Sequence, residues 1–168
     1  MRLRKAILLF VCFAAVFAVF GCDLAARGKK AYEQDPKRIE KENAEKIFEY
    51  LKNEDIDSLC ELFSKESQKH HNIRNEWESF FRHVDGKIVS YKSISYPNEG
   101  LEKDGNGEVN DSHISVNYAG VTTGNGTVYK EFGYYRVQVS KKDPDSEGLS
   151  VFTMKDPVSG EWITVGGE

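Results

Sequence analysis

Histidines are the side chains of this sequence whose spacing first suggests chemistry, as metal ligands or bases. His70 follows Glu66 by about one helical turn and adjoins His71, so this stretch offers two imidazole ligands. Neither a nearby Cys nor a His-x-x-x-His spacing completes a zinc site. Because adjacent helical residues point about 100° apart, we interpret both histidines as solvent-exposed residues at a helix end or in a loop. The sequence predicts no metal site and no cofactor.

The other candidates for acid–base or nucleophilic chemistry stand alone. His83 and His113 each lack a partner in the sequence pattern, and a single His is more often a surface or hydrogen-bonded residue than a base. Cys60 falls on an apolar helical stripe without an adjacent His, which indicates an inert buried thiol. Neither a phosphate-binding glycine loop nor a Gly-x-Ser-x-Gly motif occurs in the sequence. No catalytic residue is predicted.

An acidic stretch beginning at Asp104 has oxygen-bearing side chains at alternate positions, as in a calcium-binding loop. The sixth position of that loop requires Gly, and here it is Val109. The twelfth position requires a bidentate Glu, and here it is Ser115. The stretch is therefore interpreted as an acidic hairpin loop.

The elements that position these residues begin with helices. Three apolar stripes with helical spacing run along 35–53, 56–63 and 73–84. Asp35-Pro36 supplies an N-cap and a proline at the first helical position, and Gly86 follows the third stripe where a left-handed residue often ends a helix. The sequence therefore predicts three N-terminal helices.

Beyond Gly86 the apolar period changes to two, and β-branched and aromatic residues predominate between turn residues. Asn125-Gly126 is a strong hairpin signal, and 97–111 is interpreted as a long polar connection. Three helices followed by antiparallel strands predict an α+β fold, with the helices packed on one face of a curved antiparallel sheet. About five strands are expected, at 87–96, 113–122, 127–140, 149–155 and 162–165.

The N-terminus has the layout of a signal peptide, with a basic stretch at 1–5 and an apolar run at 6–20. As a helix the run rises only about 22 Å, short of a bilayer core of about 30 Å. Val19-Phe20-Gly21-Cys22 resembles the lipobox of bacterial lipoproteins. This resemblance implies that the Cys22 thiol becomes a thioether to diacylglycerol. The alternatives are an ordinary secretory signal with an incidental Cys22, or an uncleaved anchor.

These predictions divide the chain into a lipoprotein signal peptide at 1–21, a flexible tether at 22–34 and a single α+β domain at 35–168. The full chain carries a net charge of −4. Without the signal peptide, 20 Lys and Arg stand against 27 Asp and Glu, which gives −7. This acidic balance argues against nucleic-acid binding. The expected location is the cell membrane, lipid-anchored and facing the extracytoplasmic side.

Four stretches resemble a family of domains of unknown function found in predicted lipoproteins of Gram-positive bacteria, over about residues 36–166. They are 85–91, 133–135, 143–149 and 162–165. The order of elements resembles the nuclear-transport-factor-like fold, a cone-shaped α+β roll. The resemblance implies the fold and the surface location, and it brings no established activity.

Folds of this type enclose a space between helices and sheet, and some relatives, such as ketosteroid isomerases, catalyse reactions there. Candidate lining residues in this chain are Trp77, Phe81, Tyr91, Tyr118 and Tyr135. Because no carboxylate stands at an obviously inward strand position, we expect a membrane-anchored domain that binds a ligand or protein partner without catalysis. The alternatives are a small pocket enzyme of isomerase or lyase type, and a module that homodimerises through the open sheet face.

Overall fold

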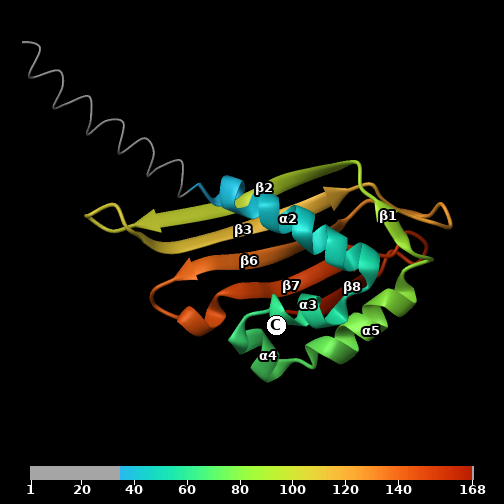
Figure 1. Cartoon of the computed structure of the whole chain (residues 1–168), viewed down its shortest axis with the longest axis horizontal. Coiled ribbons are helices and arrows are strands. Elements are labelled where there is room, and N and C mark those ends of the chain that lie inside the picture. Colours follow the sequence, from blue (N-terminus) through green and yellow to red (C-terminus); the bar gives the residue numbers. More distant parts are fainter. Residues whose placement is uncertain (1–34, 168) are drawn as a thin grey trace, which may run out of the picture.

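The computed structural model describes residues 35–167. This part of the chain contains four α-helices, α2 (Pro36–Asn53), α3 (Ile56–Glu61), α4 (Lys65–His70) and α5 (Ile73–His83), and one 3-10 helix, η1 (Pro144–Ser146). It also contains eight strands, β1 (Ile88–Ser90), β2 (Ser93–Lys103), β3 (Val109–Ala119), β4 (Val121–Thr123), β5 (Val128–Tyr129), β6 (Phe132–Ser140), β7 (Gly148–Lys155) and β8 (Trp162–Gly166). Figure 1 shows the arrangement of these elements.

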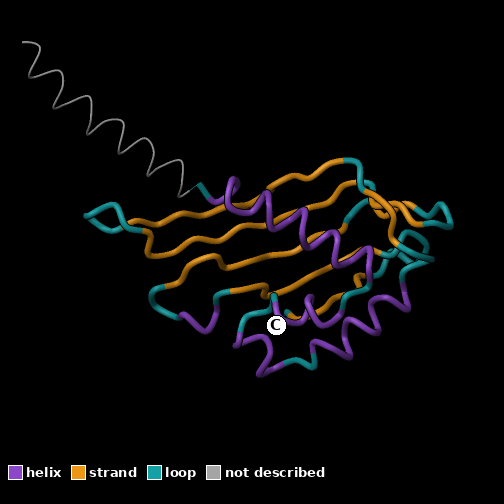
Figure 2. Tube along the Cα trace, in the orientation of Figure 1, coloured by secondary structure: helices purple, strands orange, loops and turns teal. Residues whose placement is uncertain are grey.

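The strands form two antiparallel sheets. The larger has the order β2-β3-β6-β7-β8, and the smaller has the order β1-β4-β5. The α-helices lie over one face of the larger sheet (Figures 1 and 2). The predicted α+β class, with helices packed on antiparallel strands, is therefore confirmed. The predicted numbers of elements were too low, since four helices and eight strands occur in the described residues where three and about five were expected.

Helix α2 forms as its sequence predicts. The Asp35 side chain accepts a hydrogen bond from the Lys37 N–H, and Pro36 occupies the first turn. The helix ends at Glu54, which adopts a left-handed conformation with φ 52°. Its apolar stripe is buried against the sheet and the other helices. Burial of this stripe supplies most of the stability of the helix, since propensity alone rarely holds an isolated helix in water.

Helix α4 was not predicted. Its sequence, Lys-Glu-Ser-Gln-Lys-His, has no apolar residue, and none of its residues is buried. The helix is held at its start by Ser64, whose side chain accepts from the Ser67 N–H at 3.0 Å. A capping hydroxyl satisfies an N–H that a short helix would otherwise leave open. The cap, rather than an apolar stripe, therefore explains this helix.

The prediction of a long polar connection at 97–111 was wrong. Strand β2 continues to Lys103, and β3 begins at Val109. Between them, the Asp104 carboxylate accepts from the N–H groups of Asn106 and Glu108, which makes the acidic hairpin loop. Because β2 is an edge strand, its polar residues are held in the sheet by backbone pairing and leave no apolar pattern to recognise.

Three of the predicted strands are each divided in two, which creates the smaller sheet. Gly120, with φ 64°, separates β3 from β4. Similar breaks at 91–92 and 130–131 separate β1 from β2 and β5 from β6. The predicted Asn125-Gly126 hairpin is confirmed, because β4 pairs with β5 across it and Gly126 has φ 88°.

Asp85 connects the turn after α5 to the smaller sheet. Its carboxylate accepts from the Thr127 hydroxyl at 2.6 Å and from the Asn125 amide at 2.9 Å. Both hydrogen bonds favour the ionised form, so they lower the pKa of Asp85, with Thr127 the larger cause. The bonds fasten the turn after α5 to the β4–β5 hairpin.

We expect a carboxyl NMR titration to find the pKa of Asp85 below its ordinary value of 3.8 and to find it raised in Thr127→Val. Because the folded pKa is depressed, this carboxylate stabilises the fold above its unfolded pKa, and the contribution disappears as pH falls through the folded pKa. Asp156 is the internal reference, since its lowered pKa depends on Ser159 and Val158 instead. An unchanged Asp85 titration in Thr127→Val would contradict this assignment.

Candidate functional site

Four of the five predicted pocket-lining residues belong to one hydrophobic core, and the fifth, Tyr135, lies apart from them. Trp77 and Phe81 stack on α5 with ring centroids 5.8 Å apart. Tyr91 and Tyr118 form a second group, with centroids 5.5 Å apart. Tyr135 follows the buried Tyr134 on β6, so it points to the opposite face of the sheet. The five side chains therefore do not line one common space. Cys22 lies outside the described residues and stays a prediction.

Aromatic side chains fill the space between helices and sheet. The ring of Trp77 lies 5.1 Å from those of Phe80 and Phe152, and Phe132 lies 5.3 Å from Phe152. All four residues are at most 1% exposed. Tyr118 is also fully buried and donates its hydroxyl to the backbone oxygen of Ala44 at 2.7 Å. This packing resembles an ordinary protein core rather than a substrate cavity.

A carboxylate is nevertheless buried at one end of this core. Glu40 is fully buried and accepts from the Tyr134 hydroxyl at 2.6 Å and from the Gln138 amide at 3.0 Å. The Arg136 guanidinium lies 3.8 Å from the same carboxylate. Burial, then the neighbouring Tyr118 and Glu40, raise the pKa of Tyr134 far above its ordinary value. Tyr134 is therefore a neutral donor at all physiological pH values.

The sequence held a signal for this carboxylate that was missed. Glu40 stands four residues before Ala44, in register with the apolar stripe of α2. A charged residue on a buried stripe requires an internal partner. Because hydrogen bonds from protein groups occupy both oxygens of Glu40, the cluster fastens α2 to β6. A carboxylate so enclosed has no reachable substrate proton to accept.

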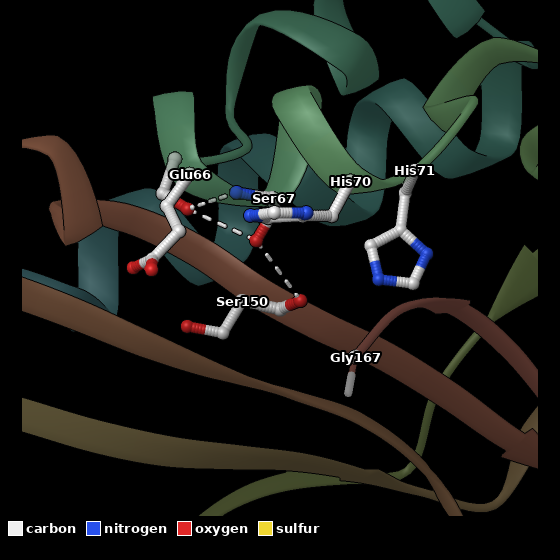
Figure 3. Close-up of a pocket in the computed structure, with 7 residues that line it drawn as sticks. Glu66, Ser67, His70, His71, Ser150 and Gly167 are labelled. Carbon is white, nitrogen blue, oxygen red and sulfur yellow. Dashed lines mark hydrogen bonds between the residues drawn. The ribbon is translucent and has the colours of Figure 1, made fainter.

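A hollow of about 380 Å³ beside α4 is lined by Ser64, Glu66, Ser67, His70, His71, Ser150 and Gly167. Figure 3 shows how the labelled residues are arranged around it. Its polar groups bind mostly one another. The Ser67 hydroxyl lies 2.9 Å from that of Ser64 and 3.4 Å from the Ser150 backbone oxygen. The interpretation of His70 as an exposed helix end is confirmed, since it is the last residue of α4.

His71 differs from its neighbour. It is half-buried, and its Nδ1 lies 3.2 Å from Glu76, whose other carboxylate oxygen accepts from the Gly166 N–H at 2.7 Å. The pair thus joins the start of α5 to the end of β8. In residues 35–167, no group of three or more His, Cys, Asp or Glu side chains is placed to hold a metal ion. Cys60 is half-buried, and burial raises the pKa of its thiol.

The face of the larger sheet opposite the helices carries a different hollow, which we term the outer groove. It has a volume of about 320 Å³ and crosses all five strands. A β-carbon on Gly133 would lie 2.2 Å from the Val116 backbone oxygen, so the chain has no room for a side chain at this point of the groove. Its lining includes Pro97, Asn117, Gly133, Tyr135, Thr153 and Trp162.

Strand register places two aromatic side chains on the outer groove, Tyr135 on the central strand β6 and Trp162 on the edge strand β8. Tyr135 pairs with Val151 on β7, and Trp162 pairs with Lys155 four residues further along β7. Trp162 is 53% exposed, whereas Tyr135 is half-buried. The Lys155 ammonium lies 5.5 Å from the centre of the Trp162 ring and 3.3 Å from Glu131. The groove therefore carries two aromatic side chains, with the small, uncharged Thr153 between them.

Residues 46–156 match the family described as Domain of unknown function (DUF5104). The chain belongs to this family. A search of curated proteins gives no match. The resemblance to a domain-of-unknown-function family, expected from the sequence, is thus confirmed.

The DUF5104 match runs from the middle of α2 into the residue after β7. It includes His71 and Tyr135, whereas Glu40 and Trp162 lie outside it. The described domain extends beyond the match at both ends. On the C-terminal side β8 completes the larger sheet, and on the N-terminal side the start of α2 carries Glu40, which is bonded to Tyr134. Within residues 35–167, α2 is the longest helix, and neither it nor any other is both long and apolar enough to cross a membrane.

Proposed function

We propose that this DUF5104 member is a lipoprotein, anchored by diacylglycerol at Cys22 on the extracytoplasmic side of the cell membrane, whose domain binds a ligand or partner without catalysis. The observation that carries the binding role is the outer groove, a hollow with an exposed Trp162 on the sheet face opposite the helices. We further propose that the α+β domain is a nuclear-transport-factor-like cone.

The membrane attachment is supported by the signal-peptide layout and the lipobox-like end of the apolar run. Two acyl chains on Cys22 give stable anchoring, because each buried methylene contributes about 0.8 kcal/mol and a single chain is marginal. The residues between Cys22 and Asp35 extend to at most about 40 Å. The domain therefore works close to the membrane surface, within reach of envelope components.

Binding is favoured over isomerase or lyase chemistry by the packing of the interior. Fully buried rings occupy the space that a substrate would need, and Glu40 is enclosed by its own hydrogen bonds. An acid or base must lie within hydrogen-bond reach of the proton that it transfers. The outer groove, in contrast, is open to solvent at Trp162.

The anchor is tested by metabolic labelling with an alkyne-bearing fatty acid. We expect the wild-type chain to take up label and to sediment with membranes, and Cys22→Ser to lose the label completely because the thioether cannot form. Cys60→Ser is the matched control, since it removes the one thiol of the described domain and should keep the label. Full labelling of Cys22→Ser would overturn the anchor.

A further inference from the structure

Building on the proposed function, we propose that the outer groove binds a neutral carbohydrate chain. The inference rests on three features of the groove: two aromatic rings, uncharged hydrogen-bonding side chains on its middle strands, and a single charged lining residue whose charge is compensated by a neighbouring lysine.

The aromatic rings are suited to sugars. One face of a pyranose ring presents C–H groups, which pack against the flat surface of an aromatic ring, while its hydroxyls stay free to hydrogen-bond. Trp162 is 53% exposed and stands beside Lys155, which restricts the ring by its 5.5 Å contact. Tyr135 is steadied by His113, with ring centroids 5.7 Å apart. Rings held in place in this way lose little conformational freedom on binding.

The middle of the groove offers hydroxyl and amide groups. Asn117 and Thr153 lie in register on either side of Gly133, on β3 and β7. The Thr153 hydroxyl can both donate and accept hydrogen bonds, as the hydroxyls of a sugar require. The Asn117 oxygen accepts from the Phe132 N–H at 3.3 Å, so Asn117 offers its amide N–H groups. Because Gly133 has no room for a side chain, no side chain fills the groove between Asn117 and Thr153.

Charge argues for a neutral occupant. Glu131 is the charged residue of the groove lining, and its carboxylate lies 3.3 Å from the Lys155 ammonium, which compensates its charge. An anionic or cationic chain would lose hydration in the groove without gaining an ionic partner. A neutral chain needs no such partner. The groove is thus complementary to a neutral polymer although the mature protein is acidic.

The separation of the rings fits a short oligosaccharide. Trp162 and Tyr135 lie two strands apart across the sheet and four residues apart along it. With strands about 4.8 Å apart and a rise of about 3.3 Å per residue, the two positions are separated by about 16 Å. This distance is spanned by a trisaccharide, with the middle sugar over Thr153 on β7, beside Gly133.

The first arm of the test measures affinity for named probes. The full chain in lipid nanodiscs is titrated with cellotriose, maltotriose and the trimer of N-acetylglucosamine. We expect at least one to bind, Trp162→Ala and Tyr135→Ala each to weaken it at least tenfold, and Trp162→Phe and Tyr135→Phe to keep most of the affinity, because each retains a ring. Equal affinity of the Ala and Phe variants, or no binding of any trimer, would overturn the carbohydrate assignment.

The second arm separates this failure from failure of the proposed function. A photo-crosslinking amino acid at Thr153 of the full chain, in the native membrane, reports what occupies the groove. An adduct removed by glycan-degrading enzymes supports the proposal. An adduct to another protein or to a second copy overturns the carbohydrate assignment and keeps the binding function. If a crosslinker at Thr153 gives no adduct and one at Val158, which is 94% exposed, gives none either, both the carbohydrate assignment and the proposed binding function are overturned.

Discussion

Trp77→Ala is expected to lower the free energy of unfolding by about 3–5 kcal/mol, the usual cost of removing a large buried aromatic side chain. Trp77 is fully buried and contacts the rings of Phe63, Phe80, Phe81 and Phe152, which come from α5, from β7 and from the chain before α4. Removing it leaves a cavity where the helices meet the sheet. Since small domains are stable by about 5–15 kcal/mol, a large share of the total would be lost. Urea denaturation followed by circular dichroism measures the change.

Two variants serve as controls for this experiment. Trp162→Ala removes the same side chain from an exposed position and should change stability by less than about 1 kcal/mol. Trp77→Phe should cost much less than Trp77→Ala, because it keeps a ring and because the indole N–H of Trp77 has no hydrogen-bond partner to lose. Equal stability of Trp77→Ala and Trp162→Ala would contradict the described core.

Tyr134→Phe is expected to lower the free energy of unfolding by about 1.5–3 kcal/mol, because hydrogen bonds to charged groups contribute about that much. The hydroxyl of Tyr134 donates to Glu40 at 2.6 Å, and Glu40 is fully buried, so the variant leaves that carboxylate oxygen without this donor. The double variant Glu40→Met with Tyr134→Phe should be more stable than Tyr134→Phe alone. Replacing a buried polar pair by apolar groups often costs less than removing one partner.

Tyr50→Phe is the matched control for the lost hydroxyl. Tyr50 also lies on α2 and is half-buried, with the Lys46 ammonium 5.5 Å from its ring. We expect its hydroxyl to contribute less than about 0.5 kcal/mol, as is usual away from the core. Thermal melts of the four proteins give the comparison. A Tyr134→Phe variant as stable as Tyr50→Phe would show that Glu40 does not need this donor.

The fold was predictable where apolar periodicity accompanied a cap, and unpredictable where backbone pairing or a single hydroxyl determined the structure. The limits of α2 follow from Asp35 and its buried stripe. In contrast, α4 depends on the Ser64 cap, and the outer half of β2 depends on hydrogen bonds to β3. Neither leaves an apolar pattern, because both elements are largely exposed.

The candidate sites were also predictable in part and unpredictable in part. Aromatic residues were correctly expected to gather between helices and sheet, yet Tyr135 was assigned to that side although Tyr134 is the inward residue. Alternate residues of a strand point to opposite faces, so the sequence alone is consistent with either Tyr134 or Tyr135 pointing inward. The hydrogen bond from Tyr134 to the buried Glu40 identifies Tyr134 as the inward residue. The outer groove requires the register of β6, β7 and β8, and strand register is a tertiary property that one sequence does not contain.

The Glu40 cluster has a mechanical consequence for a chain attached at its N-terminus. In the proposed lipoprotein, tension from the membrane would reach the described domain at Pro36, where the Gln138 amide donates to the Pro36 oxygen at 3.1 Å and to Glu40 at 3.0 Å. Together with the Tyr134 hydroxyl, these bonds lie within the first turns of α2, between the point of pulling and the rest of the domain. Under the proposed anchoring, the cluster would bear load by holding the first turns of α2 on β6.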